Sequence, residues 1–451
     1  MAKKILLVDN ELKIIEHILQ NTDWIIEVLI TINKNVLYKR NARVKKIYTE
    51  SDFWNNLDLK NFNFEDLYYF WHAQLKIENC FNRNLVDYQL GKWSYYRGFA
   101  LVKRIFEEHE IDLVIVKGPN HGWIYDRLIT DMASQKGINN YNVEVTLQYT
   151  RSIYNNLTNK LVPVHSSDSI DIEKARFYQL PKDNRIDSYK GFKGFMYKWT
   201  YKFFGELGVD LLDNIRNMDF SKDMFGRNIF TRIEKYMKLK YAKKYLDSIA
   251  VDLNTNKNYI CYAIHLEPEA AVVGMAEMDS QIAVIQMLAS SLPQGWTLYV
   301  KEHPHQFRLN KNESVYGYIY ASGVFKTKYF YNEINKIKRV SFLKTETNSK
   351  KIIENCCAMA TMTGTVAAEC VSYNKPVLVF APNRTVYNLS KGFYNISSYE
   401  DCKKAMEKIA MKEPVNYDDF EDICNKYLID FTDETIGFKQ SVKAIEADIN
   451  S

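Results

Sequence analysis

Two stretches in the second half of the chain combine residue types that bind phosphate. The first, residues 299–304, reads Tyr-Val-Lys-Glu-His-Pro, and its alternation puts Lys301 and His303 on one face of an expected strand. Pro304 is expected to end that strand, because proline cannot continue a central strand. The histidine can then donate to a phosphate or carboxylate while the lysine adds positive potential. The alternative is a histidine that bonds to a nearby backbone carbonyl.

The second stretch, residues 362–369, places a Thr-Gly-Thr turn, Thr363 to Thr365, between a buried strand and a helix of small residues. Free N–H groups and the helix dipole favour an anion at such a helix start. Gly364 lets the backbone approach a phosphate closely, and Thr365 is a candidate N-cap or phosphate donor. Glu369 lies about one turn further on, within reach of ribose hydroxyls. An ordinary capped helix with a solvated glutamate is the alternative.

Two further groups follow expected strands. Residues 265–269 read His-Leu-Glu-Pro-Glu, and their carboxylates suit acid–base or donor-orienting roles. Glu267 is the catalytic candidate there, and Glu269 is an additional candidate. In the first half of the chain His121, followed by Asp126, is the candidate base for an acceptor hydroxyl. Charged loops without chemistry are the alternative for both groups.

The sequence favours chemistry without a metal or cofactor. The eight histidines are dispersed, with His303 and His305 the one close pair, and the chain contains no His-Glu-x-x-His and no Asp-x-Asp. The Gly-x-Ser-x-Gly elbow of serine hydrolases is absent too. We therefore expect no metal site.

The elements that must position these residues alternate between strands and helices in both halves, which predicts βαβ units and parallel sheets. In the first half strands are expected at 5–8, 24–32, 44–48, 112–118 and 143–149, and helices at 64–81, 91–108 and 121–136. In the second half strands are expected at 259–265, 297–301, 340–343, 358–362 and 376–380, and helices at 280–291, 349–356 and 366–373. Ligands of such folds bind beyond the carboxyl ends of the strands, where the candidate residues lie.

We predict an α/β fold with two facing Rossmann-like domains. The expected divisions are an N-terminal Rossmann-like domain (1–160), a helical segment rich in basic and aromatic residues (161–255), a C-terminal Rossmann-like domain (256–415) and C-terminal helices (416–451). A chain of 451 residues with 46% hydrophobic and 25% charged residues agrees with two or three globular domains.

Composition limits the classes of binding partner and the cellular compartment that we expect. A net charge of +5 is too balanced for nucleic acid to be the main partner. Seven scattered cysteines fit a reducing cytoplasm, and we expect neither a signal peptide nor a membrane span.

The middle segment is where positive charge gathers. Residues 231–245 contain six basic residues and one acidic residue, and residues 189–202 interleave lysines with aromatic residues. This mixture suits the anionic inner face of a membrane or a lipid-linked acceptor. A solvated basic helix face is the alternative.

Taken in order, these motifs resemble one family. Glu-Pro-Glu at 267–269, Leu-Pro-Gln-Gly-Trp at 292–296, Val-Lys-Glu-His-Pro at 300–304 and the Thr-Gly-Thr turn through Glu369 and Lys375-Pro376 are similar to the bacterial capsule-polysaccharide biosynthesis family, which includes capsular and lipopolysaccharide Kdo transferases. The resemblance covers roughly residues 257–382.

The resemblance implies a GT-B fold and a glycosyltransferase that moves a sugar from a nucleotide-activated donor to a capsule or lipopolysaccharide glycan. CMP-activated acidic sugars such as Kdo are one donor class it implies. By position His303 would contact the nucleotide phosphate, Gly364 and Thr365 would cradle it, and Glu369 would bind the ribose. Glu267 stands where family members often have glutamine, which leaves the donor open.

The expected partners are thus a nucleotide-sugar, a glycan or lipid-linked glycan acceptor and an anionic membrane surface, at a cytoplasmic location that includes the inner face of the membrane. Two other readings stay open. One is a CDP-polyol phosphotransferase of the teichoic-acid type, and the other is a catalytically inactive GT-B scaffold.

Overall fold

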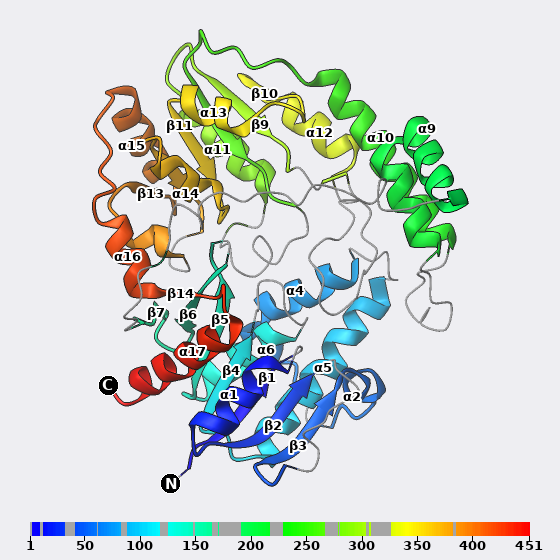
Figure 1. The fold of residues 1–451 in the computed structure, drawn as a ribbon, viewed down its shortest axis with the longest axis vertical. Helices are drawn as coiled ribbons and strands as arrows, with labels where there is room; N and C mark the ends of the chain where they lie inside the picture. The colour runs from blue at the N-terminus through cyan, green and yellow to red at the C-terminus, as the bar shows by residue number, and fades with distance from the viewer. Residues whose placement is uncertain are drawn as a thin grey trace.

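The computed structural model describes most of the chain. The described residues are 2–9, 12–31, 41–60, 62–82, 88–117, 125–147, 149–164, 170, 191–216, 229–266, 278, 280–303, 306–307, 326–381 and 385–451. Figure 1 shows two α/β bodies, one above the other, with both chain ends at the lower, N-terminal body.

The N-terminal domain is built on a twisted sheet with a parallel core. Its strands are β1 (Lys4–Val8), β2 (Ile25–Thr31), β3 (Val44–Thr49), β4 (Leu113–Lys117), β5 (Asn139–Val145), β6 (Thr150–Asn155), β7 (Lys160–Leu161) and β14 (Leu428–Asp430). They follow the order β14-β6-β5-β4-β1-β2-β3, with β7 paired to β6. The pairs from β3 to β5 are parallel, whereas β6 is antiparallel to β5, β7 and β14.

Helices cover both faces of this sheet because its core strands are apolar on both sides. Ile5 and Leu7 pack with α1 (Lys13–Asn21) and α17 (Glu434–Ile449). Leu6 and Val8 face a second cluster. That cluster draws on α2 (Glu50–Asn55), α4 (Trp71–Asn82), α5 (Tyr88–Glu108) and α6 (Asp126–Gln135), and the short α3 (Asp66–Tyr69) precedes α4.

The C-terminal domain has a fully parallel sheet of β8 (Tyr259–Ala263), β9 (Thr297–Lys301), β10 (Val340–Phe342), β11 (Ala358–Thr361), β12 (Val377–Val379) and β13 (Phe393–Asn395). The strand order is β10-β9-β8-β11-β12-β13, which is the Rossmann order 3-2-1-4-5-6. The predicted GT-B-like architecture of two Rossmann-like domains is therefore confirmed.

Two layers of helices enclose this second sheet, and the middle segment adds to one of them. One layer contains α10 (Ile229–Ile249), α11 (Gln281–Ser291), α12 (Lys328–Asn335) and α15 (Tyr399–Ala410). The other contains α13 (Ser349–Asn355), α14 (Val366–Val371), the 3-10 turn η3 (Val386–Leu389) and α16 (Phe420–Tyr427). The long α9 (Gly191–Arg216) packs against α10.

Element boundaries differ from expectation where turns interrupt the pattern. The strand expected at 143–149 stops at Val145, because the chain turns there: Tyr149 takes a left-handed conformation (φ 60°) and the Thr150 N–H donates to the Leu147 carbonyl. The hairpin strand β6 then follows, unpredicted because polar residues alternate along it. The helix expected at 121–136 is described from Asp126 onward.

The C-terminal segment returns to the first domain (Figure 1). After α16 the strand β14, which the sequence analysis does not predict, pairs with β6, and α17 packs against α1. Phe438 of α17 is fully buried, with its ring centroid 4.9 Å from that of Phe431 and 6.0 Å from that of His17. The last helix is thus part of the N-terminal core.

We expect Phe438→Ala to destabilise the protein by about 3–5 kcal/mol, because it leaves a cavity between α17 and the sheet. Ile436 of the same helix is 52% exposed, so Ile436→Ala should change the free energy of unfolding by less than about 0.5 kcal/mol. Urea denaturation of both variants checks this. Equal effects would mean that α17 is not part of the core.

Candidate functional site

The strand order of the C-terminal domain places its crevice between β8 and β11. Chain connections leave these neighbouring strands in opposite directions, and ligands of open α/β sheets bind beyond the carboxyl ends at such a switch point. His265 follows β8, His303 follows β9, and the Thr363–Thr365 turn follows β11. The structure therefore brings the three motifs of the second half to the same sheet edge.

A chain of hydrogen bonds joins His265 to the turn after β11. The Gly364 N–H donates to Thr361 Oγ1 at 3.2 Å, and Thr361 Oγ1 lies 3.3 Å from His265 Nε2. The Thr363 N–H also donates to His265 Nε2, at 3.3 Å. With the backbone N–H as donor, Nε2 must be the acceptor, so His265 holds this turn through its unprotonated nitrogen.

Gln281, buried at the start of α11, fixes the backbone of His265. Its Oε1 accepts from the His265 N–H at 2.6 Å, and its Nε2 donates to the His265 carbonyl at 3.0 Å. The Tyr262 hydroxyl donates to the same Oε1 at 3.3 Å. These paired hydrogen bonds tie the end of β8 to α11 and orient the imidazole.

A buried ion pair ties the end of β9 to the same place. Lys326 Nζ donates to Glu302 Oε1 at 2.8 Å, and both side chains are fully buried. Lys326 also donates to the His265 carbonyl, while the Tyr331 hydroxyl donates to Glu302 Oε2 at 2.8 Å. The His303 N–H donates to Glu302 Oε1 at 2.6 Å. The pair thus joins β8, β9 and the segment leading into α12.

Lys301 and His303 differ in their surroundings. Lys301 Nζ donates to the Thr345 carbonyl at 2.6 Å, and burial lowers the pKa of this ammonium. His303 is half-buried beside the switch point, held through its backbone by Glu302. Pro304 lies outside the described residues. Nucleotide binding by Lys301, His303 and Pro304 stays a prediction.

The Thr-Gly-Thr turn is shaped by its own hydrogen bonds. The N–H groups of Thr363 and Gly364 are both used within the turn network, and the helix α14 that follows is six residues long. A Cβ at Gly364 would lie 2.7 Å from Thr361 Oγ1, so the turn needs glycine. Thr365 sits at the N-cap position, and its side chain makes no cap hydrogen bond. The hydroxyl of Thr365 is therefore a candidate donor for a ligand at this turn.

Glu369 lies one turn into α14 and is partly buried. Burial raises the pKa of its carboxyl to about 7. A carboxyl held in this way can accept or donate a hydrogen bond near neutral pH, as a partner of ribose hydroxyls would.

The predicted residues of the first domain are only partly described. His121 lies outside the described residues, as do Glu267 and Glu269 of the second domain. Asp126 is fully buried, its carboxylate pairs with Lys76 and accepts from the Arg127 N–H, and burial raises its pKa. These surroundings are those of a structural ion pair, and a role for Asp126 as a base stays a prediction.

A buried pair that is not predicted from the sequence lies at the switch point of the first sheet. Asp9 follows β1 and Lys117 ends β4, with their charged atoms 4.0 Å apart. Lys117 Nζ also lies 4.8 Å from the ring centroid of Phe438. A lone aspartate after an apolar run, as at residues 5–9, is a signal that could have found this position.

Glu302, Gln281, Lys326 and Tyr331 were also missed as site residues. Glu302 lies inside the Val-Lys-Glu-His-Pro stretch, and the alternation that put Lys301 and His303 on one face put Glu302 on the other. That opposite face is the one packed against α12. For Lys326 the sequence carries no local signal, because its partner lies 24 residues earlier.

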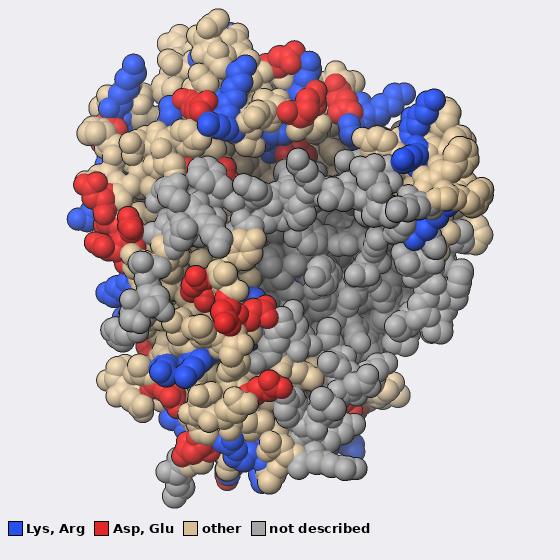
Figure 2. All heavy atoms as spheres, in the orientation of Figure 1, with Lys and Arg blue, Asp and Glu red and all other residues tan. Residues whose placement is uncertain are grey.

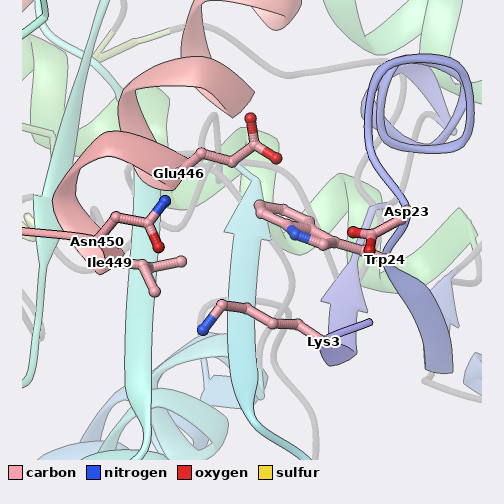
Figure 3. Close-up of a pocket in the computed structure, with 6 residues that line it drawn as sticks. All are labelled: Lys3, Asp23, Trp24, Glu446, Ile449 and Asn450. Carbon is pink, nitrogen blue, oxygen red and sulfur yellow. The ribbon is translucent and has the colours of Figure 1, made fainter. Parts of the chain in front are cut away.

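A separate pocket opens at the other end of the first sheet (Figure 3). It is lined by Lys3, Asp23, Trp24, Glu446, Ile449 and Asn450. Lys3 precedes β1 and Trp24 precedes β2, so the pocket lies at the amino ends of the strands. Parallel sheets bind ligands at the opposite ends, and we do not assign the function to this pocket.

Within the described ranges, no three His, Cys, Asp or Glu side chains gather as a metal site would require. Metal independence stays a prediction.

Glu302→Gln should destabilise the fold by about 3–5 kcal/mol, because it leaves the Lys326 ammonium buried without its counter-charge. Combining it with Lys326→Met should cost less than the sum of the two single changes. Glu333→Gln, which breaks the exposed pair with Lys336, is the matched control and should leave the free energy of unfolding nearly unchanged. Urea denaturation measures all four variants, and additive effects would contradict the buried pair.

The raised pKa of Glu369 makes stability depend on pH. Its carboxyl has a pKa of about 7 when folded against 4.5 for an unperturbed glutamate, so the stability it contributes is fully present below about pH 4.5 and is lost as the pH rises through 7. Glu369→Gln should remove this decline, which is at most about 3 kcal/mol. Unfolding measured from about pH 5 to pH 8 tests it, with Glu407→Gln on the exposed side of α15 as control. A decline unchanged in Glu369→Gln would refute the assignment.

Comparisons with known proteins bear on the second domain. Residues 220–393 match the family model described as "Capsule polysaccharide biosynthesis protein". None of the curated proteins matches the chain. Similar solved structures include Thermosulfurimonas dismutans KpsC, a beta Kdo 2,7 transferase (TM-score 0.33, 12% identity, 78% of this chain and 89% of that chain). They also include the UDP-GlcNAc 2-epimerase of Methanocaldococcus jannaschii (TM-score 0.27, 11% identity, 99% of this chain and 100% of that chain). The wall teichoic acid polymerase TagF is a third (TM-score 0.23, 10% identity, 99% of this chain and 89% of that chain).

The fold is established by the strand order of the two sheets, and the likeness to the capsule-synthesis family is confined to the matched segment. The match extends from α10 to β13 and contains the whole switch-point network. Residues 220–393 of this chain are thus similar to the capsule polysaccharide biosynthesis family.

Proposed function

We propose that the protein is a GT-B glycosyltransferase that transfers a sugar from a nucleotide-activated donor to a growing capsule glycan. One observation carries the proposal. In the domain that matches a capsule-synthesis family, a buried hydrogen-bond and ion-pair network holds His265, His303 and the Thr363–Thr365 turn at the switch point of a Rossmann sheet.

The donor nucleotide is proposed to bind over this edge. The leaving group of the reaction is an anionic phosphate, and fixed donors that face it lower the barrier to its departure. The His303 imidazole and the Thr365 hydroxyl are the proposed donors, and Glu369 is the proposed partner for the ribose. The N–H groups of Thr363 and Gly364 shape the turn, and contact of these two residues with the nucleotide is part of the proposal.

The acceptor is proposed to approach from the first domain. A capsule or lipopolysaccharide glycan, free or linked to lipid, must lose a hydroxyl proton, and His121 is the proposed base. An anionic acidic sugar such as Kdo, activated by CMP, is the proposed donor class. The reaction would take place at the cytoplasmic side of the membrane and needs no metal in this proposal.

Thermal melting with CMP, CDP, UDP, GDP and ADP, each with and without magnesium, tests the donor site. A nucleotide at about 100 times its Kd stabilises the folded state by about 2.7 kcal/mol. We expect CMP to raise the Tm without magnesium, and His303→Ala to weaken CMP binding about tenfold through the loss of a charge-assisted hydrogen bond. His109→Gln in the first domain, where His109 lies beside Glu27, is the control.

Each outcome is informative. A shift with UDP or GDP alone would retain the glycosyltransferase and discard the acidic-sugar donor. No shift with any nucleotide would overturn the proposal in favour of an inactive scaffold, and unchanged affinity in His303→Ala would remove His303 from the site.

A further inference from the structure

Helix α9 carries an aromatic stripe on its solvent side. Phe192, Phe195, Trp199 and Phe203 are all exposed and recur at steps of three, four and four residues, which places them along one face of a helix. The buried residues of the same stretch, Gly194, Tyr197 and Thr200, lie on the other side, where Tyr201 is exposed as well. The stripe ends just before Gly205, where a φ of 65° interrupts the helix.

Helix α10 repeats the arrangement. Its exposed apolar residues, Phe230, Ile233, Met237 and Tyr241, follow the same steps of three, four and four. Its buried residues are Tyr236, Leu239, Ala242 and Leu246, which pack into the core of the C-terminal domain from the opposite face. Each helix therefore buries one apolar face in the protein and leaves a second one exposed.

Lysines border both stripes. On α9 they are Lys198 and Lys202, with Lys202 Nζ 5.7 Å from the ring centroid of Phe203, and on α10 they are Lys240 and Lys244. All four are exposed, and Glu234, the acidic residue beside Ile233 on α10, is paired with Lys238. Figure 2 shows Lys and Arg side chains beside uncharged ones over the part of the molecule where Figure 1 places α9 and α10. Apolar surface with a cationic border complements a layer of anionic headgroups over acyl chains.

Another exposed aromatic group on the chain lacks this border. Tyr68, Tyr69 and Trp71, around α3, are also exposed, but Glu65 and Asp66 lie beside them. Acidic side chains oppose contact with an anionic surface, so exposure of aromatic rings alone does not define the feature. The combination with lysine distinguishes α9 and α10.

We propose that the two stripes form one docking surface by which α9 and α10 lie in the headgroup region of an anionic membrane. Among the described residues no helix has the length and apolar character to cross a bilayer, so this contact is peripheral. The aromatic rings enter the boundary between headgroups and acyl chains, and the lysines bind the lipid phosphates. The inference deepens the proposed function by naming the surface, and it rests on that function only for the identity of the acceptor.

Flotation of the full chain with vesicles tests the surface without any donor or acceptor. We expect binding to vesicles with about a third phosphatidylglycerol and at least tenfold weaker binding to pure phosphatidylcholine. Trp199→Ser combined with Tyr241→Ser should weaken binding at least tenfold. Lys198→Gln and Lys202→Gln should each weaken it about fivefold, and added salt should do the same. Because all four side chains are exposed, the variants should melt as the unchanged protein does.

Tyr68→Ser combined with Trp71→Ser is the matched control and should bind vesicles as before. Equal loss in this control, or binding that ignores lipid charge, would overturn the proposal. So would a stripe variant that keeps vesicle binding but loses a dimer in sedimentation, because the surface would then serve a second copy of the chain. If the protein binds vesicles but no nucleotide raises its Tm, the proposed function fails while the docking surface stands.

Discussion

The ion pair between Glu302 and Lys326 is the interaction on which the candidate site depends. It lies where two parallel strands end. Because both side chains are fully buried, each charge needs a counter-charge inside the protein. The carboxylate also accepts from Tyr331 and from the His303 backbone, and the ammonium also donates to the His265 carbonyl. A single buried pair thereby holds the backbones of both histidines, which follow different strands.

Buried contacts also join the end of the chain to the first domain. The last segment leaves the second domain through α16, adds β14 to the edge of the first sheet and buries Phe438 beneath it. Lys117, which ends β4, lies against the Phe438 ring and near Asp9 at the switch point of the first sheet. The end of the chain therefore supports the face from which the proposed acceptor would approach.

The sequence predicts the two domains well because apolar strands and their spacing are local signals. The expected strand at 297–301 and helix at 280–291 coincide with β9 and α11 within a residue. The hairpin strand β6 and the edge strand β14 escape this reasoning, since both are short or polar and are stabilised by partners distant in sequence. The same holds for the site. Residues of motifs next to strand ends can be predicted from the sequence, whereas Lys326 and Gln281 act through contacts that only the folded chain creates.

The switch point and the outer helices α9 and α10 differ in their charge. At the described switch point the positive charge of Lys326 is cancelled by Glu302, and Lys301 is turned to a backbone carbonyl, so little uncompensated positive charge is left to attract anions over a distance. Recognition there must come from oriented donors at short range, which suits selection of one nucleotide. Residues 231–245, in contrast, carry an excess of basic residues as large as the net charge of +5 of the whole chain. Lys238 and Lys243 of this stretch pair with Glu234 and Asp247, and the basic excess that remains on α10 is what is expected if a membrane and a nucleotide are bound by separate surfaces.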